Sequence, residues 1–244
     1  MPRWAFHGKV KIYLFIYKEA YFKMPPLTGS GCQELQLLNN TEKQKIYLIR
    51  HAKPDLPHNG KLYYGSTDYP LSEEGIKMAV HLSGALKDLE IGAVFSSDLR
   101  RAKDTAKIAL AGRSCEVKQV RGLREIHLGE WEGRSFDEVR STWNELYEKR
   151  GTSFDSVGPP GGESFKDLQK RTVPAFEDIL DNNPSGSIMV FAHGGVIWTL
   201  MCNYFGFKLN DIFFYPMDFC GIHLLERTGE FMKLIKYNWS SNLS

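Results

Sequence analysis

Two histidines in this chain each come directly after a short apolar run. Arg50 and His51 follow residues 46 to 49, and His193 follows residues 188 to 191. If both runs are buried parallel strands, their carboxyl ends meet at one edge of the sheet, where α/β folds bind ligands. We therefore expect these three residues to lie together at that edge. Arg101, in the segment after a third apolar run, is expected to join them.

Two histidines and two arginines at one edge suit a dianion, most naturally a phosphate monoester. A neutral imidazole can attack phosphorus and form a phosphohistidine, which divides one difficult transfer into two easier ones. Guanidinium groups spread the charge of the transition state, and a buried carboxylic acid can give the leaving alcohol its proton. This chemistry requires no metal and no other cofactor. Each residue alone is more often structural, so the prediction depends on the whole set.

The elements that must position these residues alternate between strands and helices, which predicts a three-layer α/β sandwich with a mostly parallel central sheet and helices on both faces. Expected strands cover residues 46 to 50, 93 to 95, 116 to 120 and 188 to 191, with a closing hairpin of 220 to 225 and 231 to 237. Expected helices cover residues 73 to 89, 99 to 109, 136 to 149, 165 to 181 and 196 to 205. Three of these helices follow a serine, so Ser72, Ser135 and Ser164 are predicted N-caps.

The chain divides into two parts by composition. Residues 1 to 43 begin with a basic, aromatic segment and continue rich in Pro, Gly, Asn and Thr, which favours an N-terminal extension that is flexible or follows an upstream start codon. Residues 44 to 244 are interpreted as one domain. The longest apolar run near the start, residues 12 to 17, is far shorter than the roughly 20 residues of a membrane span.

Charge and cysteine content limit the possible partners. The 31 basic and 29 acidic residues are interspersed, with a net charge of +2, so we expect no nucleic-acid partner and no membrane association. Cys32, Cys115, Cys202 and Cys220 are scattered without metal-binding spacing, which favours free thiols and a cytoplasmic location. No helix has a long heptad seam, so a monomer and a compact homodimer both remain open.

Five ordered segments carry a resemblance to a known family. Arg50-His51-Ala52 is followed in order by YPLSEEG at 69 to 75, SSDLRRAKDTA at 96 to 106, LREIHLGEWEG at 123 to 133 and AHGG at 192 to 195. This set resembles the histidine phosphatase superfamily, also called phosphoglycerate mutase-like, over about residues 45 to 238. A lone Arg-His pair is uninformative, whereas five ordered segments on a matching strand-helix pattern are specific.

The resemblance implies a role for each matching residue. His51 corresponds to the phosphorylated nucleophile, and Arg50 and Arg101 to arginines that hold the phosphate. Glu125 corresponds to the proton donor, and His193 to the histidine that binds and orients the phosphoryl group. Arg100 falls on a variable position of the motif and is interpreted as a surface charge.

Three differences from the family pattern bear on which substrate is bound more than on which reaction is catalysed. Ala52 stands where the signature has glycine, which costs free energy if the backbone there requires a positive φ. Residues 53 to 57 lack the pattern usual in the mutases. Trp198 stands where many relatives have an arginine.

The segment between Glu125 and Glu163 favours hydrolysis over phosphate transfer. Only 37 residues separate them, and PPGGESF at 159 to 165 resembles the short phosphatase branch. Within that branch, YYGSTDYPLSEEG at 63 to 75 followed by GEWEG at 129 to 133 is most similar to the alpha-ribazole phosphatases, a resemblance that implies a role in assembly of the cobalamin nucleotide loop. A small phosphate ester is therefore the expected partner. Further candidates for substrate contacts are Gly194, Glu163 and rings able to pack on an aromatic base, namely Tyr64, Trp131, Phe154, Phe219 and Trp198.

Two alternative functions stay open. A phosphoglycerate mutase would transfer the phosphoryl group between two phosphoglycerates. A catalytically idle sensor of phosphorylated ligands would keep the arginines but lose the nucleophile or proton donor, whereas this sequence keeps His51, Arg101, Glu125 and His193 together.

Overall fold

The computed structural model describes residues 43–57 and 61–239. The predicted extension, residues 1 to 43, lies outside the described residues except for Lys43, as does Cys32. No helix in the described ranges is long and apolar enough to cross a membrane.

The described residues form a six-stranded sheet in the order β3-β2-β4-β1-β5-β6. The strands are β1 (Gln44–Arg50), β2 (Ala93–Ser96), β3 (Val117–Gln119), β4 (Ile188–Ala192), β5 (Ile222–Thr228) and β6 (Phe231–Trp239). The first four in chain order run parallel to one another, and β5 and β6 form the predicted antiparallel hairpin. The mostly parallel sheet is therefore confirmed.

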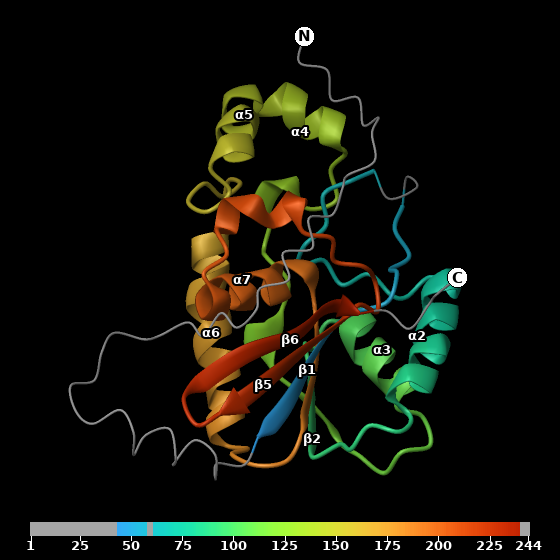
Figure 1. The fold of residues 1–244 in the computed structure, drawn as a ribbon. Coiled ribbons are helices and arrows are strands. Elements are labelled where there is room, and N and C mark those ends of the chain that lie inside the picture. The colour runs from blue at the N-terminus through green and yellow to red at the C-terminus, as the bar shows by residue number, and fades with distance from the viewer. Residues whose placement is uncertain (1–42, 58–60, 240–244) are drawn as a thin grey trace, which may run out of the picture.

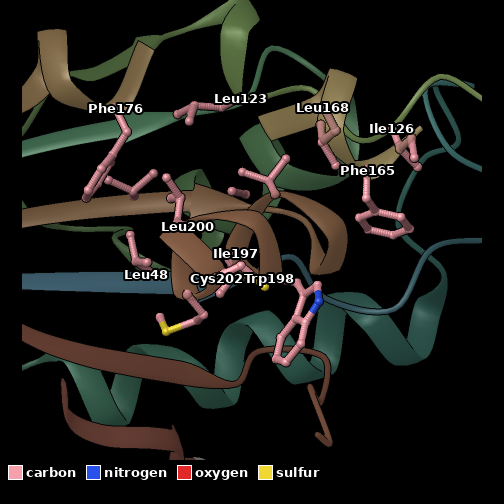
Figure 2. Packing of buried hydrophobic residues seen from close by; sticks show 14 of the residues in the cluster. Leu48, Leu123, Ile126, Phe165, Leu168, Phe176, Ile197, Trp198, Leu200 and Cys202 are labelled. Carbon is pink, nitrogen blue, oxygen red and sulfur yellow. The ribbon is translucent and has the colours of Figure 1, made fainter. Parts of the chain in front are cut away.

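Helices cover both faces of this sheet (Figure 1), as predicted. These helices are α2 (Glu73–Leu86) and α3 (Arg100–Ala109) on one face and α6 (Phe165–Asp181) and α7 (Gly194–Phe205) on the other, whereas the short α4 (Phe136–Thr142) and α5 (Asn144–Thr152) lie beyond the end of the sheet. Alternate residues of β1 point to opposite faces. Ile49 packs with residues of α2 and α3, whereas Leu48 packs with residues of α6 and α7. Figure 2 shows Leu48 near Ile197, Leu200 and Cys202 in the second of these cores.

Serine side chains cap the N-termini of three helices at the predicted positions. The Ser72 hydroxyl accepts a hydrogen bond from the Gly75 N–H at the start of α2. Ser135 and Ser164 form reciprocal capping boxes with Glu138 and Asp167. Such caps satisfy backbone donors that the first turn of a helix leaves without partners.

The predicted helix from 136 to 149 is wrong as one element, because the structure divides it into α4 and α5. Trp143 leaves the helical region, with φ −126° and ψ 47°. Its ring lies 6.4 Å from that of Trp131 and beneath the Arg134 guanidinium. Packing of this large ring and the weak helix propensity of the Ser-Thr-Trp-Asn segment around it both favour the break.

The start of α7 also differs from the prediction. The helix begins at Gly194 rather than at residue 196, which makes His193 its N-cap. The backbone N–H groups of Gly194 and Gly195 therefore lie at a helix N-terminus, which favours negative charge.

Candidate active site

Neighbouring strands place the two histidines at the same edge of the sheet. Arg50, the last residue of β1, pairs with Ala192, the last residue of β4. The His51 N–H then donates to the Ala192 carbonyl at 2.9 Å. The rings of His51 and His193 lie 5.0 Å apart, and the two residues are 1% and 0% exposed. The register between β1 and β4 therefore brings the two histidines together, as predicted.

Hydrogen bonds assign the tautomer of His51. Its Nδ1 lies 2.7 Å from the Ala52 carbonyl oxygen. A carbonyl can only accept, so Nδ1 carries the proton and Nε2 carries the lone pair. The Arg101 Nε–H points at this Nε2 from 3.3 Å. Burial, followed by the positive charges of Arg101 and Arg50, lowers the pKa of His51 well below its ordinary value. The ring is therefore neutral at neutral pH in the ligand-free protein.

Ala52 is not strained in place of the family's glycine. It is buried and does not have a positive φ. Its N–H donates to the Thr105 hydroxyl at 2.9 Å, and that hydroxyl donates to the Arg101 carbonyl at 2.6 Å. The backbone that accepts from His51 is therefore fixed to α3. Thr105 is a contact that the sequence did not single out.

Arg101 is fully buried with its guanidinium fixed by a loop. Nη1 donates to the Thr67 carbonyl at 2.7 Å and Nη2 to the Gly65 carbonyl at 2.6 Å. Burial lowers its pKa, although Glu125 acts in the opposite direction, and an arginine remains charged at neutral pH. Arg100, by contrast, is exposed, as its variable motif position predicts.

Arg50 is held on the other side of His51. Its Nη1 donates to the Met217 carbonyl, and the Phe219 ring lies 4.1 Å from the guanidinium carbon. The same ring lies 5.6 Å from that of His51. Cys220 adopts a left-handed conformation, with φ 59°, and its N–H donates to the Arg50 carbonyl. Strained backbone of this kind is often found at functional sites.

Glu125 reaches the same place from the segment after η2 (Arg121–Leu123). Its Oε2 accepts from the Gly195 N–H at 3.1 Å, and its Oε1 accepts from the Ile126 N–H at 2.9 Å. A Cβ on Gly195 would lie only 2.4 Å from Oε1. Glycine is therefore required at 195 for the carboxyl group to approach the start of α7.

His193 differs from His51 in its contacts. Neither of its ring nitrogens has a hydrogen-bond partner among the described residues, although both are buried. Burial, then the charge of Arg101, lowers its pKa well below the ordinary value. A neutral imidazole retains one N–H donor and one acceptor. Neither is used by a hydrogen bond to the described residues.

Glu163 contacts an arginine, but neither Arg50 nor Arg101. It forms an ion pair with Arg171 at 2.7 Å. Arg171 in turn donates to the Arg124 carbonyl at 2.8 Å and the Glu125 carbonyl at 2.9 Å. The pair thus positions the segment that carries Glu125. Arg171 was missed from the sequence because it lies in α6, 46 residues from Glu125, and belongs to none of the five motifs.

The candidate rings separate into two groups. Tyr64 and Phe219 lie by the two arginines, with the Tyr64 ring 5.8 Å from the Arg101 guanidinium carbon. Trp131 and Trp198 belong to the core, and Figure 2 shows Trp198 there. The Trp198 indole N–H donates to the Leu209 carbonyl. Phe154 packs on Phe165 and Phe213. This packing favours structural roles for the last three rings, because their faces are covered by other side chains.

Gly194 lies directly against Arg50. A Cβ at this position would meet Arg50 Nε at 3.6 Å, an ordinary contact distance.

No group of three or more His, Cys, Asp or Glu residues within the described ranges is arranged to hold a metal ion. That no metal takes part in the reaction stays a prediction.

Comparisons with known proteins agree on one family. Residues 46–240 match the model of the histidine phosphatase superfamily, branch 1. The chain is 35% identical over 160 residues to the metal-independent phosphoserine phosphatase of Arabidopsis thaliana, covering 64% of this chain and 67% of that protein. It is 30% identical over 158 residues to the adenosylcobalamin/alpha-ribazole phosphatase of Salmonella typhimurium, covering 64% and 77%. The solved structure of Bacillus stearothermophilus YhfR superposes with a TM-score of 0.76 at 30% identity, covering 81% of this chain and 98% of that one.

Proposed function

The chain belongs to branch 1 of the histidine phosphatase superfamily, and we propose that it is a metal-independent phosphomonoesterase that acts through a phosphohistidine intermediate. Membership confirms the resemblance drawn from the five motifs and makes the protein a phosphatase of that family. The intermediate and the substrate are our proposal. The observation that carries it is the His51 ring, whose Nδ1 is bonded to Ala52 so that the Nε2 lone pair is presented beside Arg101.

In the first step, the Nε2 lone pair of His51 attacks phosphorus and the bond from phosphorus to the ester oxygen breaks. Glu125, in its protonated form, gives its proton to the leaving oxygen, so that a neutral alcohol departs. Arg50 and Arg101 stabilise the charge on the phosphoryl oxygens, and the neutral His193 donates one further hydrogen bond. The bound phosphate also compensates the charges of the buried Arg101 and the half-buried Arg50, both of which lower the pKa of the two histidines in the ligand-free site.

In the second step, the Glu125 carboxylate takes a proton from water as the water oxygen attacks phosphorus. The bond between phosphorus and Nε2 breaks, the lone pair returns to His51, and phosphate leaves. The hydrogen bonds from Gly195 and Ile126 keep the carboxyl group in place for both proton transfers. One group thus serves as acid and then as base, as microscopic reversibility requires.

The first candidate substrate is alpha-ribazole 5′-phosphate, whose leaving group carries an aromatic base. Phe219 and Tyr64 support this choice, because each places a ring close to one phosphate-site arginine. Stacking on such rings favours planar groups. The second candidate is phosphoserine, which the Arabidopsis relative supports by its name and its identity to this chain.

The test is the initial rate of phosphate release from alpha-ribazole 5′-phosphate, phosphoserine, 3-phosphoglycerate and an aryl phosphate, with a chelator present. A preference for alpha-ribazole 5′-phosphate that disappears in the His51→Ala protein is the expected result. Preference for phosphoserine would replace the first candidate by the second. Release that persists in His51→Ala would overturn the phosphohistidine mechanism.

Measurements of phosphoglycerate exchange and of ligand binding, made beside the release rates, separate the alternative functions. A mutase would exchange phosphate between 2- and 3-phosphoglycerate faster than it releases phosphate. An idle sensor would bind phosphate esters without any release. The small distance between the two histidine rings and the retained Glu125 favour hydrolysis over the sensor.

A further inference from the structure

Glu132, which the mechanism does not use, lies at the centre of a dense set of hydrogen bonds. It follows η3 (Gly129–Trp131), and its carboxylate accepts from the loop of residues 65 to 67. The donors are the backbone N–H groups of Gly65 at 3.0 Å, Ser66 at 2.8 Å and Thr67 at 3.4 Å, and the hydroxyls of Ser66 at 3.1 Å and Thr67 at 2.6 Å. The Leu128 N–H adds a further bond at 3.1 Å. Successive N–H groups of the loop thus converge on one anion.

The opposite side of this loop holds Arg101. The carbonyls of Gly65 and Thr67, whose own N–H groups face Glu132, accept the two terminal nitrogens of the guanidinium. The Arg101 Nε–H is then directed at His51 Nε2. A continuous set of hydrogen bonds therefore runs from the Glu132 carboxylate through the loop to the nucleophile.

We infer that Glu132 is a positioning residue, which shapes the loop of residues 65 to 67 so that its carbonyls hold Arg101 in the orientation that binds the phosphoryl group. The inference rests on the proposed function, in which Arg101 contacts the substrate phosphate. Glu132 itself touches neither His51 nor the reacting atoms in this arrangement.

An indirect connection suits the chemistry better than an ion pair. A carboxylate bonded directly to Arg101 would neutralise the charge that the phosphate needs and would compete with it. Neutral carbonyls fix the guanidinium without cancelling its charge. The more distant Glu132 still favours the charged form of the buried Arg101.

Two further observations support the role of Glu132. Burial acts to raise its pKa, but the hydrogen bonds from Thr67 and the backbone hold that pKa below its ordinary value. The loop is also closely packed, because a Cβ on Gly65 would lie 2.0 Å from the Ile126 carbonyl oxygen. An ionised Glu132 in a tightly packed loop leaves the two carbonyls little freedom to move.

The first test compares Glu132→Gln with Glu130→Gln, a change of the same kind at an exposed residue two positions earlier. An amide nitrogen at 132 would face backbone N–H donors, so the loop must rearrange. We expect inorganic phosphate to bind about tenfold more weakly to Glu132→Gln by calorimetry, and kcat/KM to fall by a similar factor. Glu130→Gln should match the unmodified protein. Equal phosphate affinity in the two variants would overturn the inference.

A double-mutant comparison tests whether Glu132 acts through Arg101. In the Arg101→Ala background, Glu132→Gln should cause no further loss of phosphate affinity, because the group it positions is absent. A full, additive loss there would contradict the inference and indicate a general structural role. The variant Thr67→Val replaces Glu132→Gln in this test if Glu132→Gln does not fold, because it removes only one hydroxyl donor to Glu132. It should weaken phosphate binding by a smaller factor, and unchanged affinity in this variant would also count against the inference.

The calorimetric measurement separates this inference from the proposed function. Normal hydrolysis together with unaltered phosphate binding in Glu132→Gln would refute the role of Glu132 alone. Phosphate binding that depends on Glu132 without hydrolysis by the unmodified protein would support the positioning role and refute the proposed enzyme. Absence of phosphate binding by the unmodified protein would overturn both.

Discussion

His51 and His193 occupy similar positions but have opposite hydrogen-bond environments. Both follow the last residue of a buried parallel strand, both are almost completely buried, and burial lowers the pKa of both. Both nitrogens of His51 have protein partners, whereas neither nitrogen of His193 has one among the described residues.

One edge of the sheet thus holds two histidines whose rings differ in their hydrogen bonds. The bond to Ala52 assigns one tautomer to His51 and directs its lone pair toward the site. Buried polar groups are normally hydrogen-bonded, and the proposed mechanism gives the His193 ring a partner in the phosphoryl group of the substrate. In that mechanism the first ring reacts and the second binds.

The largest expected effect is that of His51→Ala. Loss of the nucleophile should lower kcat by about 10⁴-fold or more and abolish the acid-labile phosphoenzyme in quenched reactions with labelled substrate. Phosphate should still bind, because Arg101 and His193 remain. His81→Ala, at an exposed histidine of α2, is the control. A phosphoenzyme in His51→Ala would assign the nucleophile to another residue.

His193→Ala should have the next largest effect and should differ in kind. Loss of a donor to the phosphoryl oxygens is expected to lower kcat/KM by about 100-fold to 1000-fold. The phosphoenzyme should nevertheless form, only more slowly. Rapid-quench measurement of phosphoenzyme formation in both variants checks this contrast. If His193→Ala formed none while binding phosphate normally, the roles of the two histidines would need to be exchanged.

Gly195→Ala tests the role of Glu125 as the proton donor. The new methyl group would displace the Glu125 carboxyl, since it meets Oε1 at 2.4 Å, whereas Gly194→Ala meets only ordinary contacts. We expect kcat to fall about 100-fold for alkyl phosphates. The loss should be smaller for aryl phosphates, whose leaving groups need no proton. Equal losses for both substrate types, or for both glycine variants, would contradict the role of Glu125.

The smallest expected effect concerns stability and pH. Burial lowers the pKa of His51, His193 and His223, that of His223 to about 4, so the unfolded chain binds more protons below pH 6.5 than the folded one. The free energy of unfolding of the ligand-free protein should be greatest above pH 6.5 and fall toward pH 4. Each histidine contributes about 1.4 kcal/mol per pH unit between its two pKa values.

Urea unfolding between pH 7.5 and 4.5 measures this slope. The slope should decrease in His193→Ala, which removes one of the three titrating groups. Phosphate should also reduce it, because a dianion beside His51 and His193 favours their protonated forms. An unchanged slope in His193→Ala would show that this ring is not held neutral by burial.

Much of the fold could be predicted from local patterns. The alternation of apolar runs with serine-capped helices identified the sandwich and its parallel sheet, because strand and helix periods differ and caps have a short-range signature. The break at Trp143 and the early start of α7 at Gly194 could not be predicted. Both depend on partners that are distant in the chain, the Trp131 ring in the first case and the Glu125 carboxylate in the second.

For the site, local sequence was enough to predict which groups are present and which strand ends carry them. This was possible because Arg50, His51 and His193 adjoin the apolar runs that become β1 and β4. How these groups are oriented depends on the folded domain. The pairing of β1 with β4, the bond from His51 to Ala52, and the contacts of Arg171 and Glu132 join segments that the sequence separates or leaves unoriented. Hydrogen bonds depend on angstrom-scale geometry, which the packing of the whole domain sets.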